Sequence, residues 1–224
     1  MADTIAAIAT GAQVAAIGII RISGPEALPI VDRLFRPASG KLMSEYEDRK
    51  LVYGRLTDLS GDLLDLCLCT VSHAPHSYTG EDTAELQCHG SPTVLRAALE
   101  ELFHAGARQA LPGEFTKRAF LNGRMELSSA EAVADIIDAE SIECAKNAAA
   151  QLSGAVAVKA DNIYSTLTDI SSHYHAVLDY PDEDIEDFRL ENYKQQLSSA
   201  ADSLRALLGS FERGKLMGSG IPAA

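Results

Sequence analysis

Three charged side chains are the strongest candidates for binding chemistry, because each stands in a segment that is otherwise apolar or turn-forming. Arg21 and Glu85 each interrupt a run of strand-forming residues, and Arg124 directly follows the turn-forming pair Asn122-Gly123. A carboxylate in a strand can accept hydrogen bonds from a ligand with adjacent N–H donors. A guanidinium in such a place can reach a paired anion.

Each of these residues also has a structural explanation. Alternation along a strand puts Glu85 on a solvated face if its apolar neighbours face the core. A single arginine such as Arg21 or Arg124 is most often a surface charge. A buried carboxylate, by contrast, must be paired or hydrogen-bonded. The three residues form a site only if the fold brings them together, which their spacing does not show.

A second candidate is the junction His89-Gly90-Ser91-Pro92 between a predicted strand and a predicted helix. Glycine lets a backbone approach a ligand closely, and a helix N-terminus offers free N–H groups to an anion. The alternative is a purely structural turn.

Other chemical motifs are absent from the sequence. It contains neither G-x-x-x-x-G-K-[ST] nor G-x-G-x-x-G, and the D-x-x-G match at 58–61 is explained by a hairpin turn. His173 and His175 lie two apart on a predicted helix and do not share a face. We therefore expect no metal site and no catalytic acid–base group.

The elements that must position these residues are of two kinds. Residues 1–128 combine β-branched, alternating runs with short amphipathic stretches, which predicts a mixture of strands and helices. The predicted strands are 4–9, 17–22, 50–57, 64–70 and 83–89, and the predicted helices are 25–35, 92–105 and 112–121.

From residue 128 onward the pattern is helical. Ser128 and Glu131 have the spacing of a capping box, and the apolar residues Ala130, Val133, Ala134 and Ile137 are expected to form the buried face of the first helix. Apolar residues then recur every three or four positions over 149–177, with an interruption near Gly154, and again over 190–211. Pro181 and the acidic run after it end the first of these helices. The sequence predicts a helical hairpin that needs further helices to cover it, so we expect 129–224 to be less stable than 1–128.

Composition and charge narrow the class of protein. The 224 residues carry a formal net charge of −13, with an excess of four acidic groups in 1–128 and nine in 129–224. An acidic chain is unlike a protein that coats nucleic acid, and an anion site is expected in the less acidic first part. No apolar run suits a membrane span, the N-terminus lacks a secretory pattern, and the four cysteines lack metal-like spacing. A cytoplasmic protein with reduced thiols is expected.

Several blocks of sequence resemble, in the same order, the family of tRNA-modification GTPases called MnmE or TrmE. SYTGED at 77–82 and PGEFTKRAFLNG at 112–123 are two of them. The others lie at 3–10, 18–24, 85–90, 130–137 and 178–185. Together they span nearly the whole chain.

The resemblance implies an α+β fold with two domains. Residues 1–120 would form a mixed-sheet domain like that of the folate-binding aminomethyltransferases, binding 5-formyl- or 5,10-methylene-tetrahydrofolate and forming a homodimer. Residues 121–224 would begin an all-α helical domain. Matched to the family pattern, the folate contacts fall on Arg21, Glu85 and Arg124.

The resemblance also implies a longer protein. A potassium-dependent GTPase domain with GTP and magnesium would follow residue 224, so this chain alone is expected to hydrolyse no GTP. With the FAD-dependent protein MnmG, the family installs an aminomethyl-type group, such as carboxymethylaminomethyl, on C5 of the wobble uridine of certain tRNAs.

Three departures from the family pattern affect the expected site. The loop 11–16 reads GAQVAA where the family usually has a loop rich in glycine and proline, Arg124 stands where lysine is common, and Ser91 replaces the second glycine of His-Gly-Gly. Two alternatives stay open. One is a stand-alone aminomethyltransferase-like enzyme, and the other is a dimeric scaffold that binds no folate.

Overall fold

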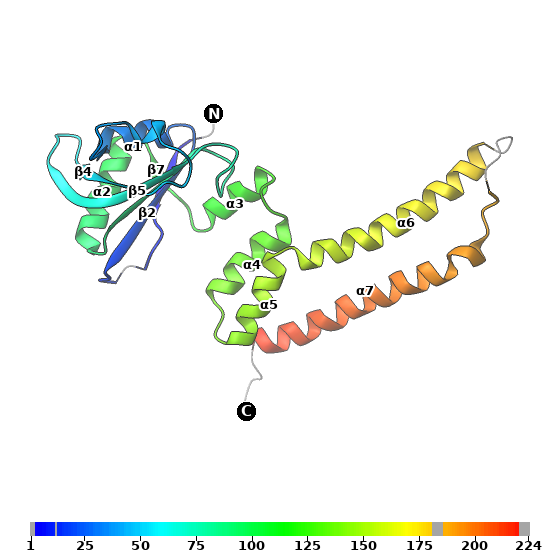
Figure 1. Ribbon diagram of the computed structural model, residues 1–224. Helices are drawn as coiled ribbons and strands as arrows, with labels where there is room; N and C mark the ends of the chain where they lie inside the picture. Colours follow the sequence, from blue (N-terminus) through cyan, green and yellow to red (C-terminus); the bar gives the residue numbers. More distant parts are fainter. Residues whose placement is uncertain (1–2, 12, 181–185, 220–224) are drawn as a thin grey trace, which may run out of the picture. The chain divides into compact units, whose positions relative to one another are not determined.

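The computed structural model describes residues 3–11, 13–180 and 186–219, with side chains described up to residue 209. The chain divides into two compact units, residues 1–125 (unit 1) and residues 126–224 (unit 2). Unit 1 is α+β and unit 2 is helical (Figure 1). The α+β class expected from the sequence is confirmed.

A mixed sheet organises unit 1. Among the described residues, seven strands pair in the order β3-β4-β5-β6-β2-β1-β7, and β1 and β7 are the parallel pair. The strands are β1 (Ile5–Ile8), β2 (Ile17–Ser23), β3 (Phe35–Pro37), β4 (Val52–Thr57), β5 (Leu63–Ser72), β6 (Thr83–His89) and β7 (Arg108–Gln109). The sequence predicts β1, β2, β4, β5 and β6, including the β4–β5 hairpin. It misses the two- and three-residue strands β7 and β3, which are too short to show alternation.

One face of the sheet is covered by α1 (Ala27–Leu34) and α2 (Pro92–His104) (Figure 1). Ile20, Ile22 and Leu86 on that face are fully buried. The apolar stripe predicted on α2 is buried as expected. Since alternate residues of a strand point to opposite faces, the residues between these core positions lie on the other face, which carries the candidate site.

The remaining elements of unit 1 are short. A 3₁₀ turn, η1, covers Met43–Glu45, and α3 covers Glu114–Leu121. Cys67, Cys69 and Cys88 are buried free thiols, in agreement with the expected reduced cysteines of this unit.

Unit 2 consists of α4 (Leu127–Ile137), α5 (Ile142–Leu152), α6 (Ala155–Asp179) and α7 (Leu190–Ser219) in the described part of the chain. The predicted interruption is confirmed at Gly154, where φ is 81°, a conformation that glycine adopts at low cost. Helices α6 and α7 run side by side as the expected hairpin (Figure 1). The acidic run expected to end α6 includes residues 181–185, which lie outside the described residues.

The prediction for the start of unit 2 was wrong in two respects. Helix α4 begins at Leu127 and has no side-chain cap, so the Ser128–Glu131 capping box does not form. Its buried residues are Ser129 and Ala132, whereas Ile137 is 75% exposed. Of the other predicted core residues, Ala134 is exposed and Ala130 and Val133 are half-buried. The small residues face α5, because close helix packing favours short side chains at the contact.

Exposed apolar side chains lead to a first prediction, that proteases remove unit 2 before unit 1. Ile137 and Ile142 are 75% exposed and Leu208 is 69% exposed, so unit 2 buries less of its apolar surface and should open more often. A time course of limited proteolysis, read by mass spectrometry, should show fragments of 126–224 while 1–125 stays intact. Loss of both units at the same rate would contradict this.

No helix in the described part of the chain has both the length and the apolar character needed to cross a membrane.

Candidate ligand-binding site on the sheet of unit 1

Three polar residues form one row across neighbouring strands of unit 1. In the strand register, Arg21 of β2 lies opposite Glu85 of β6, and Glu85 lies opposite Thr70 of β5. All three alternate with core residues and so lie on the face away from α1 and α2. The sequence could not reveal this row, because β2 and β6 are paired although 59 residues separate Ser23 from Thr83 along the chain.

Arg21 and Glu85 contact each other directly. Arg21 Nε donates to Glu85 Oε1 at 2.8 Å, and the two side chains are 33% and 29% exposed. The guanidinium carbon lies 5.4 Å from the centre of the Tyr78 ring and 5.7 Å from that of Phe115, distances at which a cation is attracted to an aromatic face. Arg21 is therefore held in place, while the second oxygen of Glu85 accepts no hydrogen bond from the described residues and can serve a ligand.

A pocket of about 390 Å³ lies over this row and is lined by Arg21, Thr70, Tyr78 and Glu85. The hydroxyl oxygen of Thr70 is buried and has no hydrogen-bond partner among the residues that the structure describes. A buried polar atom without a hydrogen-bond partner is destabilising. This hydroxyl therefore indicates that a polar group of a ligand forms the missing hydrogen bond. The volume is in the range of small-molecule pockets.

Arg49 also lines the pocket and was not singled out from the sequence. Its backbone has a φ of 62°, the left-handed conformation that non-glycine residues rarely adopt. Its Nη2 donates to the carbonyl of His76 at 2.6 Å. No sequence signal identifies such a residue, since its neighbours do not predict a left-handed turn.

Arg124 does not line the pocket. Its Nε donates to the carbonyl of Ser77 at 3.2 Å, and its side chain packs against Gly80. Ser77 and Gly80 flank Tyr78, so Arg124 holds the loop that forms one wall of the pocket. The structure thus brings Arg21 and Glu85 together and places Arg124 behind that loop.

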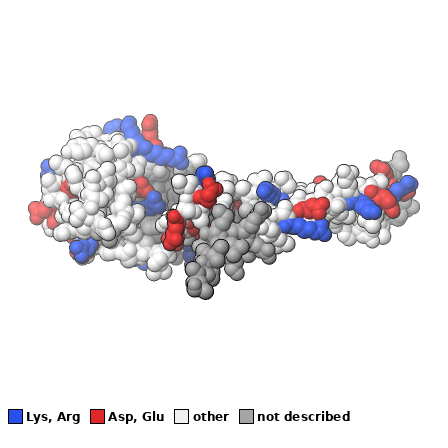
Figure 2. Space-filling model, turned by 90° about the horizontal axis from the view of Figure 1, so that it is seen from below, with Lys and Arg blue, Asp and Glu red and all other residues white. Residues whose placement is uncertain are grey.

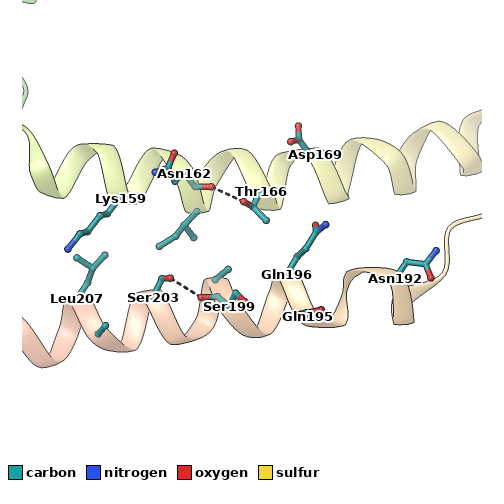
Figure 3. A pocket seen from close by; sticks show the side chains of 13 residues that line it. Lys159, Asn162, Thr166, Asp169, Asn192, Gln195, Gln196, Ser199, Ser203 and Leu207 are labelled. Atoms are coloured by element: carbon teal, nitrogen blue, oxygen red, sulfur yellow. Dashed lines mark hydrogen bonds between the residues drawn. The ribbon is translucent and has the colours of Figure 1, made fainter.

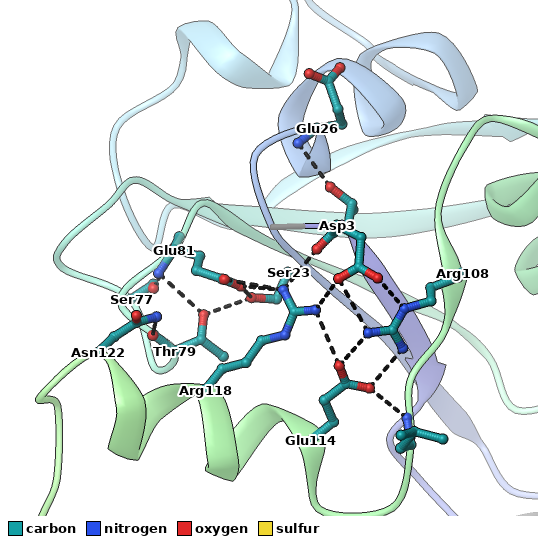
Figure 4. Close-up of polar contacts among 12 residues, drawn as sticks. Asp3, Ser23, Glu26, Ser77, Thr79, Glu81, Arg108, Glu114, Arg118 and Asn122 are labelled. Atoms are coloured by element: carbon teal, nitrogen blue, oxygen red, sulfur yellow. Dashed lines mark hydrogen bonds and ion pairs between the residues drawn. The ribbon is translucent and has the colours of Figure 1, made fainter. Parts of the chain in front are cut away.

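A network of ion pairs fixes the same loop at Glu81 (Figure 4). Arg118 of α3 donates to both oxygens of Glu81, at 3.1 and 3.0 Å, and to Asp3 Oδ1 at 2.7 Å. Arg108 binds Asp3 and Glu114. Hydrogen bonds from Arg108 lower the pKa of Asp3 and of Glu114 to about 2, so both stay ionised at neutral pH.

Buried hydroxyls connect this network to the end of β2. Ser23 donates to Glu81 at 2.7 Å and lies 2.7 Å from the hydroxyl of Thr79, and both residues are fully buried. Asn122 donates to the carbonyl of Thr79 at 2.7 Å. The SYTGED segment is therefore held at several points, which explains how a loop keeps the exposed Tyr78 close to Arg21.

The junction at His89 is a structural feature rather than part of the pocket. A Cβ on Gly90 would lie 2.3 Å from the carbonyl oxygen of Ala15, so glycine allows the close approach of the two segments. The His89 ring lies 2.7 Å from Asp65 and is 74% exposed. The structural explanation of this junction is the one that the contacts favour.

Unit 2 contains a second, larger hollow between α6 and α7, of about 1020 Å³ (Figure 3). Two of its hydroxyl groups bond to their own helices, Thr166 to the carbonyl of Asn162 at 2.9 Å and Ser203 to that of Ser199 at 2.8 Å. We assign no binding site there.

Charge is distributed unevenly over the surface. On the face of unit 1 visible in Figure 2, large areas are uncharged, and Lys and Arg side chains stand mainly at the margin. A largely uncharged face is unlike the basic surface of a nucleic-acid interface.

Comparison with known proteins agrees with this division of the chain. Residues 4–124 match the family model described as "GTP-binding protein TrmE N-terminus", and residues 127–222 match "MnmE helical domain". The two matches meet where unit 1 ends and unit 2 begins.

Curated relatives point to the same family. The protein of Symbiobacterium thermophilum is 41% identical over 99% of this chain and 48% of its own length. Those of Clostridioides difficile and Carboxydothermus hydrogenoformans are 40% and 41% identical over 98% and 100% of this chain. Each is named "tRNA modification GTPase MnmE", and the chain spans about half the length of the curated relatives it matches. With family models over both units and relatives along its whole length, the chain belongs to the MnmE (TrmE) family.

Proposed function

We propose that unit 1 binds a tetrahydrofolate carrying a one-carbon unit, 5-formyl- or 5,10-methylene-tetrahydrofolate. The observation that carries this proposal is the row of Arg21, Glu85 and Thr70, in which the buried Thr70 hydroxyl has no partner among the described residues. When bound, the folate supplies a carbon unit at the formyl or methylene oxidation level.

The chemistry of the row fits a pterin ring. A pterin presents adjacent N–H donors along one edge, and a carboxylate can accept two of them. Glu85 has this role in the proposal, and Thr70 offers a hydroxyl that can donate or accept beside it. Tyr78, which is 41% exposed at the pocket, offers an aromatic face against which a flat ring can stack.

The anionic glutamate tail of a folate requires a cation. Arg21 and Arg124 are the residues that the family pattern assigns, and Arg49 is a third cation at the pocket. Because Arg124 is joined to the loop at Ser77 and does not line the pocket, we propose that it acts by holding that loop. Arg49 is then the better placed partner for a carboxylate.

We further propose that the chain works within a longer protein that modifies tRNA, as the names of its relatives indicate. In this proposal unit 1 forms a homodimer, a GTPase domain uses GTP, magnesium and potassium, and the FAD-dependent protein MnmG is the partner. Together they would add an aminomethyl-type group to the wobble uridine in the cytoplasm. The net charge of −13 makes other parts of that assembly the natural place for tRNA contacts.

Calorimetric titration with 5-formyl-tetrahydrofolate tests the folate site. Glu85→Gln keeps the size of the side chain but presents an N–H group to the pterin donors, so we expect its affinity to fall about 100-fold, near the value of a lost charge-assisted pair. Thr70→Val, which removes the hydroxyl and keeps the shape, should weaken binding about tenfold. Glu100→Gln, at an exposed position of α2 on the covered side of the sheet, is the matched control and should bind like the wild type.

The results distinguish the other functions that the sequence leaves open. A folded wild-type chain that binds no folate would contradict the proposal and favour a scaffold. Equal affinities for the wild type and Glu85→Gln would place any folate elsewhere. Transfer of an aminomethyl group to a small substrate by this chain alone, detected by mass spectrometry, would favour a stand-alone enzyme.

A further inference from the structure

A cluster of metal-ligating side chains lies on the opposite face of the sheet from the proposed folate site. The ligand atoms of Asp65, Cys67 and Cys88 all lie within 4.8 Å of one another. The register that pairs Leu68 with Gln87 continues to place Cys67 of β5 directly opposite Cys88 of β6. The donors are thus fixed by two paired strands rather than by loops.

The cluster is built into the protein interior. Cys67 and Cys88 are 4% and 2% exposed, and the Asp65 side chain is 9% exposed. Burial and a preset position reduce the entropy that ligands lose when a cation binds. Carboxylates are seldom this buried unless they are paired. Asp65 is paired with His89 and accepts a hydrogen bond from the backbone N–H of Leu66 at 2.8 Å, and among the described residues no arginine or lysine forms an ion pair with it.

His89 supports the carboxylate from the solvent side. Its backbone N–H donates to Asp65 Oδ2 at 2.8 Å, and its ring Nδ1 lies 2.7 Å from Oδ1. Carboxylates that bind a metal are themselves hydrogen-bonded, as Asp65 is here. The His89 side chain is 74% exposed, so this support for Asp65 comes from a surface residue.

We propose that Asp65, Cys67 and Cys88 bind a zinc-class divalent cation. Two thiolates and one carboxylate are donors that Zn²⁺ prefers, and a water molecule would complete four-coordination. Tetrahedral bonds of about 2.3 Å place two sulfurs about 3.8 Å apart, within the 4.8 Å limit on the present separations. The cation would offset most of the three negative charges of its ligands.

Binding breaks both S–H bonds as the two metal–sulfur bonds form, and the protons pass to the buffer. No oxidant or reductant is required. A Cys67–Cys88 disulfide, by contrast, would form only with an oxidant such as a peroxide or a glutathione disulfide.

Titration of the reduced full chain with Co²⁺ tests the proposal, because tetrahedral cobalt bound by thiolates has intense visible bands and a sulfur-to-cobalt charge-transfer band. The wild type should take up one Co²⁺ with both features, and Zn²⁺ should abolish them. Cys67→Ala and Cys88→Ala should lose the charge-transfer band or halve it. Cys69→Ala is the matched control, since Cys69 is equally buried on the same face of β5 but lies outside the cluster.

A second measurement tests the proposal even if the Cys67 and Cys88 variants fold poorly. Zn²⁺ should raise the melting temperature of the wild type and of Cys69→Ala, and it should release about two protons per metal ion from the thiols. Absence of the charge-transfer band in the folded wild type would overturn the proposal. So would an equal band in Cys67→Ala and Cys88→Ala, or a wild type that forms a Cys67–Cys88 disulfide and binds no metal when re-reduced.

Discussion

Replacing Arg118 with alanine should lower the free energy of unfolding of unit 1 by about 2–4 kcal/mol, the range for removing one member of a largely buried charge network. The Arg118 side chain is 11% exposed and binds Glu81, Asp3 and Glu114. Without it, the Glu81 carboxylate, which is 17% exposed, loses its cation. Urea denaturation of the full chain, followed by hydrogen exchange in peptides of unit 1, measures the change.

Two further variants show whether burial is the cause. Arg118→Lys keeps the charge but has one donor group, so it cannot bridge three carboxylates and should recover only part of the stability. Arg108→Ala removes the other cation, whose side chain is 41% exposed, and should cost less because water screens exposed pairs. An Arg118→Ala variant as stable as the wild type would show that the network does not hold unit 1 together.

Acid should reduce the difference in unfolding free energy between Arg108→Ala and the wild type. Hydrogen bonds from Arg108 lower the pKa of Glu114 from 4.5 to about 2, so the folded state favours the ionised form. The resulting stabilisation is complete above pH 4.5 and is lost as the pH falls through about 2. A difference between the two proteins that stays constant over this range would contradict an electrostatic origin.

The sequence predicts most of this fold because the strands of unit 1 are amphipathic. In β6, Ala84 and Leu86 alternate with polar residues, so both the strand and its two faces are readable. The same alternation places Glu85 away from the core, which the structure confirms. For α4 the apolar pattern predicted the wrong buried face, because small residues such as Ser129 and Ala132 can form a helix contact without any apolar periodicity.

The candidate site was only partly predictable. Arg21 and Glu85 could be singled out because each is a charge within an apolar run. Their pairing depends on β2 lying next to β6, which is a property of the sheet order and not of either strand. No sequence pattern distinguishes Arg49 from other surface arginines. Cys67 and Cys88 lie opposite each other only because of the register between β5 and β6. Convergence of residues from different strands is what sequence patterns do not encode.

Gly24→Ala should be the most damaging single substitution at the end of β2, with an expected loss of about 3–5 kcal/mol from backbone strain and steric overlap. Gly24 has a φ of 134°, and a Cβ there would lie 2.7 Å from the Cα of Thr4 and 2.8 Å from the carbonyl oxygen of Asp3. These are backbone atoms, so no side-chain rotation relieves the contact. Hydrogen exchange of unit 1 in urea measures the loss.

A glycine with a similar constraint but free space is the matched control. Gly40 has a φ of 81°, and no described atom lies within 4 Å of the position that a Cβ would take. Gly40→Ala should therefore cost about 1–2 kcal/mol from the left-handed conformation alone. The difference between the two variants measures the contact with Thr4 and Asp3 together with the higher cost of a φ of 134° than of 81°. Equal losses would show that the close approach at Gly24 is unimportant.

The steric overlap at Gly24 should also weaken binding at the proposed folate site. The carbonyl of Asp3 that a Cβ would displace accepts a hydrogen bond from Arg118 at 2.8 Å, and Gly24 N–H donates to the carbonyl of Asp82 at 3.0 Å. Both contacts hold the segment that carries Tyr78. The fraction of Gly24→Ala that remains folded should therefore bind 5-formyl-tetrahydrofolate more weakly than the wild type, whereas Gly40→Ala should bind it equally well. Unchanged affinity in folded Gly24→Ala would mean that the loop is positioned by Arg124 and Asn122 without help from the end of β2.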